Sequence, residues 1–91
     1  MDSGDWARWV GQVVVVDTDS EYLYLGTLDK VLDHFIVLKD ADAHDRRESP
    51  STKEQYTMDS KRFGVKVNRK EIQIRIAKVV SFSRLEDVVL Y

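Results

Sequence analysis

The apolar residues of this chain come in short runs, and none of these runs, residues 13–16 included, is longer than four residues. The runs are rich in Val, Ile, Leu and aromatic residues and are separated by turn-forming stretches such as residues 17–20 (Asp-Thr-Asp-Ser). This pattern is typical of strands, because β-branched and aromatic side chains fit a pleated surface. Since a spanning helix needs roughly 20 apolar residues, we expect no membrane-spanning segment and no membrane partner.

Five segments have the composition of strands, namely residues 12–17, 21–28, 32–40, 72–76 and 79–83. The first segment is apolar on both faces, which predicts a strand that is covered on two sides. Gly26 lies inside the second segment and predicts a bend, a bulge or a close approach of the backbone, because it has no side chain to pack. Residues 43–62 are polar and contain the sole proline, Pro50, and they predict a long loop with room for an extended piece.

Residues 3–9 can form one or two helical turns with Trp6 and Trp9 on one face. We interpret the tryptophans as packing over one end of the fold, and an exposed peptide-binding surface is the alternative. The short helix, the five strands and the short reversals predict an all-β fold. We expect one domain over residues 1–91, a small, strongly bent, five-stranded antiparallel barrel of the SH3-like kind with a short N-terminal helix.

Several functional classes are excluded or disfavoured by composition. The 91 residues include no Cys, which excludes disulfides, thiolate metal sites and a cysteine nucleophile. No secretory signal is recognisable at the start of the chain, so we expect a cytoplasmic location. With two histidines, no glycine-rich phosphate loop and no nucleophile motif, we expect no enzymatic activity and no cofactor.

The formal net charge of -2 hides an asymmetry. Residues 1–45 contain ten acids and three bases, a balance of -7, and residues 46–91 contain six acids and eleven bases, a balance of +5. The simplest interpretation is pairing of opposite charges within and between subunits, because a nucleic-acid footprint normally comes with a basic domain. The basic pairs Arg46-Arg47, Lys61-Arg62 and Arg69-Lys70 are either phosphate contacts or solvated loop ends.

Two segments resemble the sequence motifs of the Sm and Sm-like (LSm) protein family. In the first, residues 13–41, the matching positions are the valines 13–16, Gly26-Thr27-Leu28, Val31 and residues 37–41. In the second, residues 74–82, Ile74, Arg75 and the later apolar positions agree. The chain is thus similar to a divergent, bacterial-type member of the family. The resemblance implies a short N-terminal helix, a bent five-stranded barrel, assembly into a homo-oligomeric ring through edge strands, and RNA binding by the loops.

The resemblance implies that two turns contact single-stranded RNA. The candidate residues are Asp33, His34 and Phe35 in the first turn, and Arg75 and Lys78 in the second. The side-chain rings of His34 and Phe35 could stack on a base, and the cationic side chains of the second turn could contact a phosphate or a base edge. In the alternative, Phe35 belongs to the core, His34 is a solvated turn residue and Arg75 pairs with an acid.

The chain departs from the family pattern at both RNA-contacting turns. Counting from Gly26, Leu32 takes the place of the family's Asp, with Asp33 one residue late, and Ile36 takes the place of its Asn. Ile76 stands where the second motif has Gly, although Arg75 is retained. The resemblance therefore supports the fold and self-association more than it supports RNA binding.

Two further sets of residues are candidates for contacts. Apolar side chains that would form the seam between subunits are Val79, Val80, Phe82, Val88, Val89 and Leu90. Asp40, Asp42 and His44 would share one face of an extended strand, where carboxylates and an imidazole could hold a divalent cation. The alternative for this acidic run is pairing with Arg46, Arg47 or Lys61. For the whole chain, the alternative to an RNA-binding ring is an SH3-like module that binds a protein or serves as a structural subunit.

Overall fold

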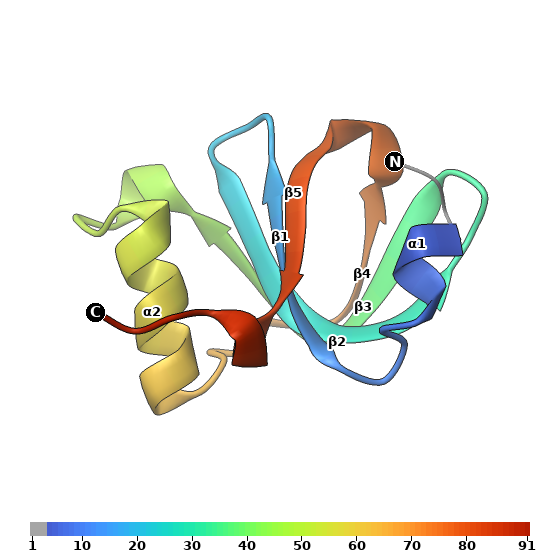
Figure 1. The fold of residues 1–91 in the computed structure, drawn as a ribbon. Helices are drawn as coiled ribbons and strands as arrows, with labels where there is room; N and C mark the ends of the chain where they lie inside the picture. The colour runs from blue at the N-terminus through green and yellow to red at the C-terminus, as the bar shows by residue number, and fades with distance from the viewer. Residues whose placement is uncertain (1–3) are drawn as a thin grey trace.

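A computed structural model describes residues 4–91, in which five antiparallel strands form one strongly curved sheet (Figure 1). The strands are β1 (Val13–Thr18), β2 (Tyr22–Val31), β3 (Phe35–Asp45), β4 (Arg69–Arg75) and β5 (Val79–Arg84), in the spatial order β4-β3-β2-β1-β5. The helices are α1 (Gly4–Ala7) and α2 (Lys53–Phe63), and the short 3-10 turns are η1 (Arg46–Glu48), η2 (Ile76–Lys78) and η3 (Leu85–Asp87). The five predicted antiparallel strands are confirmed, and β4 and β5 form the two edges of the sheet.

The sheet bends at Gly26 of β2, where the backbones of β2 and β3 approach each other closely. A Cβ on Gly26 would lie 3.0 Å from the Cα and the Cβ of Ala41, which confirms the predicted close approach of the backbone. The register of the two strands shifts at this point. Opposite Gly26, Asp40 has a φ of 48°, in a region that residues other than glycine seldom adopt. The bend therefore depends on a missing side chain in β2 and on a local backbone distortion in β3.

Side chains on the two faces of β1 pack into different clusters. Val14 and Val16 are fully buried in one cluster with Trp6, and Val15 is buried in a second cluster with Leu23 and Leu25. The prediction of a strand covered on two sides is therefore confirmed. We name these clusters the Trp6 core and the α2 core, because Tyr56 of α2 packs against the second.

The N-terminal tryptophans cover one end of the fold, as predicted: Trp6 is a member of the Trp6 core, and Trp9 packs against it. Trp6 is fully buried, and its ring centroid lies 3.6 Å from that of Phe82; Trp9 lies 4.9 Å from the same ring. The predicted N-terminal helix is not confirmed. Ser3 lies outside the described residues, and α1 covers only the four residues Gly4–Ala7 before the chain enters turns.

The prediction of a long polar loop at residues 43–62 is wrong for most of that segment. β3 continues to Asp45, and α2 occupies eleven residues at the left of Figure 1. The Thr52 side chain caps α2 by accepting a hydrogen bond from the Gln55 N–H at 3.0 Å. Gly64, with a φ of 97°, ends the helix. No helix within residues 4–91 has the length and apolar character to cross a bilayer.

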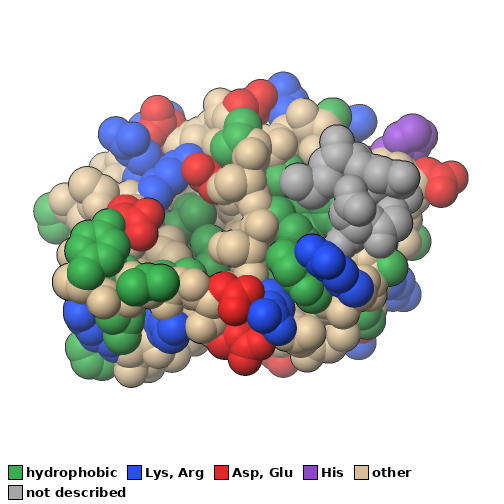
Figure 2. Space-filling model, in the orientation of Figure 1, with side chains coloured by type: hydrophobic (Ala, Val, Ile, Leu, Met, Phe, Trp, Pro, Cys, Tyr) green, Lys and Arg blue, Asp and Glu red, His purple; other side chains and the backbone are tan. Residues whose placement is uncertain are grey.

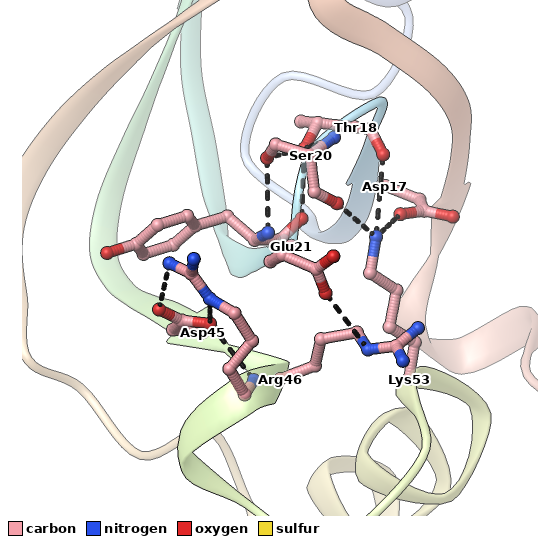
Figure 3. A network of polar contacts seen from close by, with 9 residues as sticks. Asp17, Thr18, Ser20, Glu21, Asp45, Arg46 and Lys53 are labelled. Atoms are coloured by element: carbon pink, nitrogen blue, oxygen red, sulfur yellow. Dashed lines mark hydrogen bonds and ion pairs between the residues drawn. The ribbon is translucent and has the colours of Figure 1, made fainter.

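The acidic first half and the basic second half pair with each other inside the molecule. Of the seven ion pairs within residues 4–91, four join an acid of residues 1–45 to a base of residues 46–91. In Figure 3, Lys53 of α2 donates to the Asp17 carboxylate at 2.6 Å and to the Ser20 carbonyl at 2.9 Å, and Arg46 pairs with Glu21 at 3.1 Å. The internal part of the predicted charge pairing is confirmed, and it ties α2 and η1 to the β1–β2 turn.

Candidate nucleic-acid interface

The β2–β3 turn presents two of the candidate RNA residues at its tip. β2 continues to Val31, and β3 starts at Phe35, three residues later than predicted. The Leu32 N–H donates to the Phe35 carbonyl at 2.8 Å and closes the turn. Asp33 and His34 are therefore exposed, and Figure 2 shows a histidine beside an acidic side chain at its upper right, over this turn.

The end of β4 lies directly beside this turn because β3 and β4 are paired. Phe35 is opposite Arg75 in the register, and the Ile76 N–H donates to the His34 carbonyl at 2.9 Å. The Arg75 guanidinium lies 5.2 Å from the centre of the Phe35 ring, within the range of a cation–π contact. Residues far apart in the sequence are thus held together by backbone hydrogen bonds.

Asp33, His34 and Arg75 line one open pocket of about 420 Å³, together with Ile76, Ala77 and Val79. The pocket combines an imidazole ring, a carboxylate and a guanidinium at the surface. A flat heteroaromatic group fits this combination, because a ring can stack on it while the carboxylate accepts and the guanidinium donates hydrogen bonds. Ile36 is fully buried in the Trp6 core, so no amide side chain is present where the family pattern has Asn.

Lys78 belongs to a neighbouring pocket. Its Nζ lies 3.8 Å from the Asp19 carboxylate, and its carbonyl accepts a hydrogen bond from the Asp19 N–H at 3.0 Å. The neighbouring pocket, of about 550 Å³, also includes Tyr24 and Gln73, and Arg75 forms a wall of both pockets. Burial raises the pKa of the Tyr24 hydroxyl above its usual value. Lys78 is therefore separated from the other candidate RNA residues, which lie at the β2–β3 turn and the end of β4.

The structure does not assemble the predicted cation site. Asp40 is exposed, whereas Asp42 is buried and accepts hydrogen bonds from the Tyr56 hydroxyl at 2.5 Å and the Asn68 amide at 2.9 Å. The His44 ring stacks on Tyr56 with 3.6 Å between ring centres. Within residues 4–91, no group of three or more His, Asp or Glu side chains is arranged to hold a metal. The backbone distortion at Asp40 breaks the strand alternation on which the prediction relied.

The Asp42–Tyr56–Asn68 contact is a feature that sequence reasoning missed. Burial and then the hydrogen bond to Asp42 raise the pKa of Tyr56 well above its usual value. The phenol therefore remains a donor to the buried carboxylate throughout the neutral range. The three residues come from α2, β3 and the segment before β4, and no local pattern in the sequence marks them as neighbours.

The predicted seam residues fall into two groups. Phe82 packs on the tryptophans, Val88 packs against the α2 core, and Val79 lines the Asp33 pocket. By contrast, Val80 is 60% exposed, Val89 is 73% exposed and Leu90 is 40% exposed. Val80 lies on the edge strand β5, at the point where the register with β1 shifts. The first group supports the fold, and the second is available for contacts with another molecule.

Comparison with known proteins identifies the fold. No protein-family model and no curated protein matches the sequence. Among solved structures, the chain is similar to the Pyrococcus abyssii Sm protein in complex with a uridine heptamer. The two chains share 22% sequence identity, the match covers 85% of this chain and 87% of the archaeal chain, and the TM-score is 0.57.

The chain has an Sm-like fold. The resemblance read from residues 13–41 and 74–82 is therefore confirmed as a statement about the fold. The narrower prediction of a bacterial-type member stays a prediction, since the similar structure is archaeal.

Proposed function

We propose that this chain is a non-enzymatic, cytoplasmic Sm-like module that binds single-stranded RNA and assembles into a homo-oligomeric ring. The observation that carries the RNA part is the pocket that joins Asp33 and His34 to Arg75. It lies between the β2–β3 turn and the end of β4, in a fold shared with an Sm protein that was solved with a uridine heptamer. That likeness supports the proposal, and the pocket chemistry gives it a mechanism.

In this mechanism, one base enters the pocket and stacks on the His34 ring or on the Arg75 guanidinium. Stacking of a base on such groups is worth about 1–3 kcal/mol and tolerates different bases. A base with both donors and acceptors on its edge is favoured, because Asp33 accepts hydrogen bonds and Arg75 donates them. Since one such pocket binds weakly, a ring of identical subunits would raise the affinity for a strand that reaches several pockets.

The ring part of the proposal rests on the two edges of the sheet. Within the described residues, β4 pairs only with β3 and β5 pairs only with β1, so each strand keeps one edge without a partner. Unpaired edges invite pairing with another chain, and head-to-tail pairing of unlike edges closes into a ring. The exposed Val80 lies on one of these edges. We retain the expectation of a short N-terminal helix that includes α1.

Binding of a labelled uridine heptamer, followed by fluorescence anisotropy, tests the RNA part. We expect Arg75→Ala to weaken binding about tenfold, because loss of a stacking and hydrogen-bonding group costs on the order of 1–3 kcal/mol. Arg46→Ala is the matched control: it also removes an exposed arginine, but from the η1 turn, and we expect it to leave the affinity nearly unchanged. Equal effects of both variants, or no binding at all, would overturn the RNA proposal and favour the SH3-like protein module.

The absolute mass from light scattering on a size-exclusion column tests the ring part. We expect a multiple of the 10.6 kDa chain mass. Val80→Lys should yield a monomer with unchanged stability, because it places a charge on an exposed edge position. Leu32→Lys is the control, an exposed apolar residue in the β2–β3 turn. A wild-type protein that elutes as a monomer would contradict the ring.

A further inference from the structure

The structure separates the three basic pairs of the sequence into two kinds. Arg46 and Arg47 are neutralised by Glu21 and Asp45. The other two pairs fall within residues 61–70, which contain five bases (Lys61, Arg62, Lys66, Arg69 and Lys70) and no acid. We name residues 61–70 the basic bend. Within residues 4–91, Arg62, Lys66 and Lys70 form no ion pair, and all three are exposed.

The basic bend is held in a defined shape at both ends. Gly64 turns the chain out of α2, and its N–H donates to the Ser60 carbonyl at 2.9 Å. Asn68 ties the other end to β3: its N–H donates to the Ala41 carbonyl at 2.9 Å, and its side chain bonds Asp42 and Ala43. These contacts fix the backbone around Lys66, and the other four cations belong to α2 or β4. The basic bend therefore presents its cations on an ordered surface.

An exposed aromatic ring lies within this surface. Phe63, at the last position of α2, is 79% exposed, and Val67 is 54% exposed. Figure 2 shows green and blue side chains next to each other at the lower left, over the C-terminal end of α2. Lys61 donates to the Glu86 and Val88 carbonyls, and interaction with the helix dipole accounts for Arg62. It does not account for Lys66, Lys70 or the exposed ring.

We propose that the basic bend is a second RNA-binding surface, which contacts the sugar–phosphate backbone of a single strand while Phe63 stacks on a base. Unneutralised cations beside an exposed aromatic ring are the combination that binds single strands without sequence preference. The surface extends the proposed function but does not use the Asp33 pocket. In Figure 1 the end of α2 lies at the lower left, and the β2–β3 turn lies at the upper right. A short oligonucleotide in the pocket and a strand on the basic bend are therefore separate binding events.

Salt-dependent binding of oligoadenylate separates the basic bend from the pocket. The variant Arg62→Gln/Lys66→Gln/Lys70→Gln removes three exposed cations from the bend. The control Lys30→Gln/Lys39→Gln/Arg46→Gln removes three exposed cations elsewhere, so both variants have the same net charge. Each phosphate contact contributes about 0.7 to the slope of log affinity against log salt concentration. We expect the slope to fall by about 2 in the bend variant and to stay close to wild type in the control.

The aromatic part has its own test. Phe63→Ser should weaken oligoadenylate binding about fivefold or more and leave the salt slope unchanged, since stacking does not release counterions. Thermal unfolding of each variant is recorded alongside, and we expect wild-type midpoints because the substituted side chains are exposed. A Phe63→Ser protein that binds as well as wild type would restrict the surface to its cations.

The outcomes distinguish this proposal from the preceding one. A lower affinity for oligoadenylate and a lower salt slope in the bend variant, with both unchanged in the control, support the basic bend whatever Arg75→Ala does to heptamer binding. A bend variant with wild-type affinity and slope overturns it, even if the pocket binds uridine. Bend-dependent binding to vesicles containing phosphatidylserine, without binding to RNA, also overturns it and assigns the surface to a membrane.

Discussion

The two cores of this small protein differ in the kinds of side chain that form and surround them. In the Trp6 core, the buried residues are all apolar: Trp6, Val14, Val16, Leu28, Ile36, Leu38, Ala41 and Ile74. Among the residues that the structure describes, the α2 core has three buried members, Val15, Leu23 and Leu25. It is completed by half-buried side chains from α2, from the segment before β4 and from the C-terminal segment. Around it, buried or partly buried polar groups pair with one another, such as Asp42 with Tyr56 and Asp17 with Lys53.

The difference shows how each half is stabilised. Burial of apolar area stabilises the Trp6 core without requiring particular partners, at about 25 cal/mol for each Å² removed from water. On the α2 side, each polar contact contributes only about 1 kcal/mol, yet an unmatched buried group costs about 1–3 kcal/mol. We therefore expect substitutions in the Trp6 core to lower the free energy of unfolding by a large amount, whichever apolar neighbours remain. On the α2 side we expect smaller losses, which depend on the polar partner that is removed.

The largest effect is expected for Trp6→Ala. The ring is fully buried against Phe82, and loss of a buried tryptophan typically lowers the free energy of unfolding by about 3–5 kcal/mol. Urea unfolding measures the change. Trp9→Ala is the matched control, since Trp9 contacts the same ring but is only half-buried. If Trp9→Ala destabilised the protein as much as Trp6→Ala, the comparison of the two cores would not hold.

The Trp6 core is also the part that the sequence predicts well. The isoleucines of β4 and the two tryptophans repeat at strand or helix spacing, which places their side chains on one face. The unbroken run of valines in β1 predicts a strand that is covered on both faces. The resemblance to the Sm motifs also uses the valines of β1 and Ile74. Only the ends of the strands differ, because pairing with a neighbour extends β2 and β3 beyond the apolar run.

The second prediction probes the α2 side through Tyr56→Phe. The substitution keeps the ring on His44 but removes the hydroxyl that donates to the buried Asp42 carboxylate. We expect a loss of about 1–3 kcal/mol in the free energy of unfolding. Amide hydrogen exchange should become faster mainly in α2, because the contact ties this helix to β3.

Tyr22→Phe is the matched control, because the Tyr22 hydroxyl makes no hydrogen bond to residues 4–91. We expect little change from it. Exchange that became faster uniformly across the sheet in Tyr56→Phe, with α2 no more affected than β1, would show that α2 does not open separately.

The α2 side is hard to predict from the sequence for a physical reason. Its helix has no clear apolar stripe, since only Tyr56 and Met58 of its inner residues are large, and its length cannot be inferred from periodicity. Local signals were nevertheless present: Thr52 three residues before Gln55 is typical of a helix start, and Gly64 is typical of a helix end. The Asp42–Asn68 contact and the distortion at Asp40 depend on tertiary packing, which no local pattern records.

The smallest effect is expected for the pH dependence of the Asp45–Arg47 pair beside η1. The Arg47 side chain donates to both Asp45 carboxylate oxygens, at 3.0 and 2.8 Å, and its backbone N–H donates at 3.0 Å. These hydrogen bonds lower the pKa of Asp45 to about 2. Because the folded pKa lies below the unfolded value of about 4, the pair stabilises the fold above pH 4, and this contribution disappears as the pH falls towards 2.

Asp45→Asn keeps an acceptor oxygen for the Arg47 N–H and removes the charge. We expect the variant to be less stable than wild type above pH 4, and the difference to vanish near pH 2. Urea unfolding at a series of pH values measures this. Asp19→Asn is the control, since its pair with Lys78 spans 3.8 Å between exposed side chains and should contribute little. A difference between wild type and Asp45→Asn that stayed constant from pH 2 to pH 7 would show that the pair does not act through the ionised carboxylate. The hydrogen bonds at the start of η1 would then stabilise the fold without a contribution from charge. In its independence of charge, this part of the α2 side would resemble the Trp6 core.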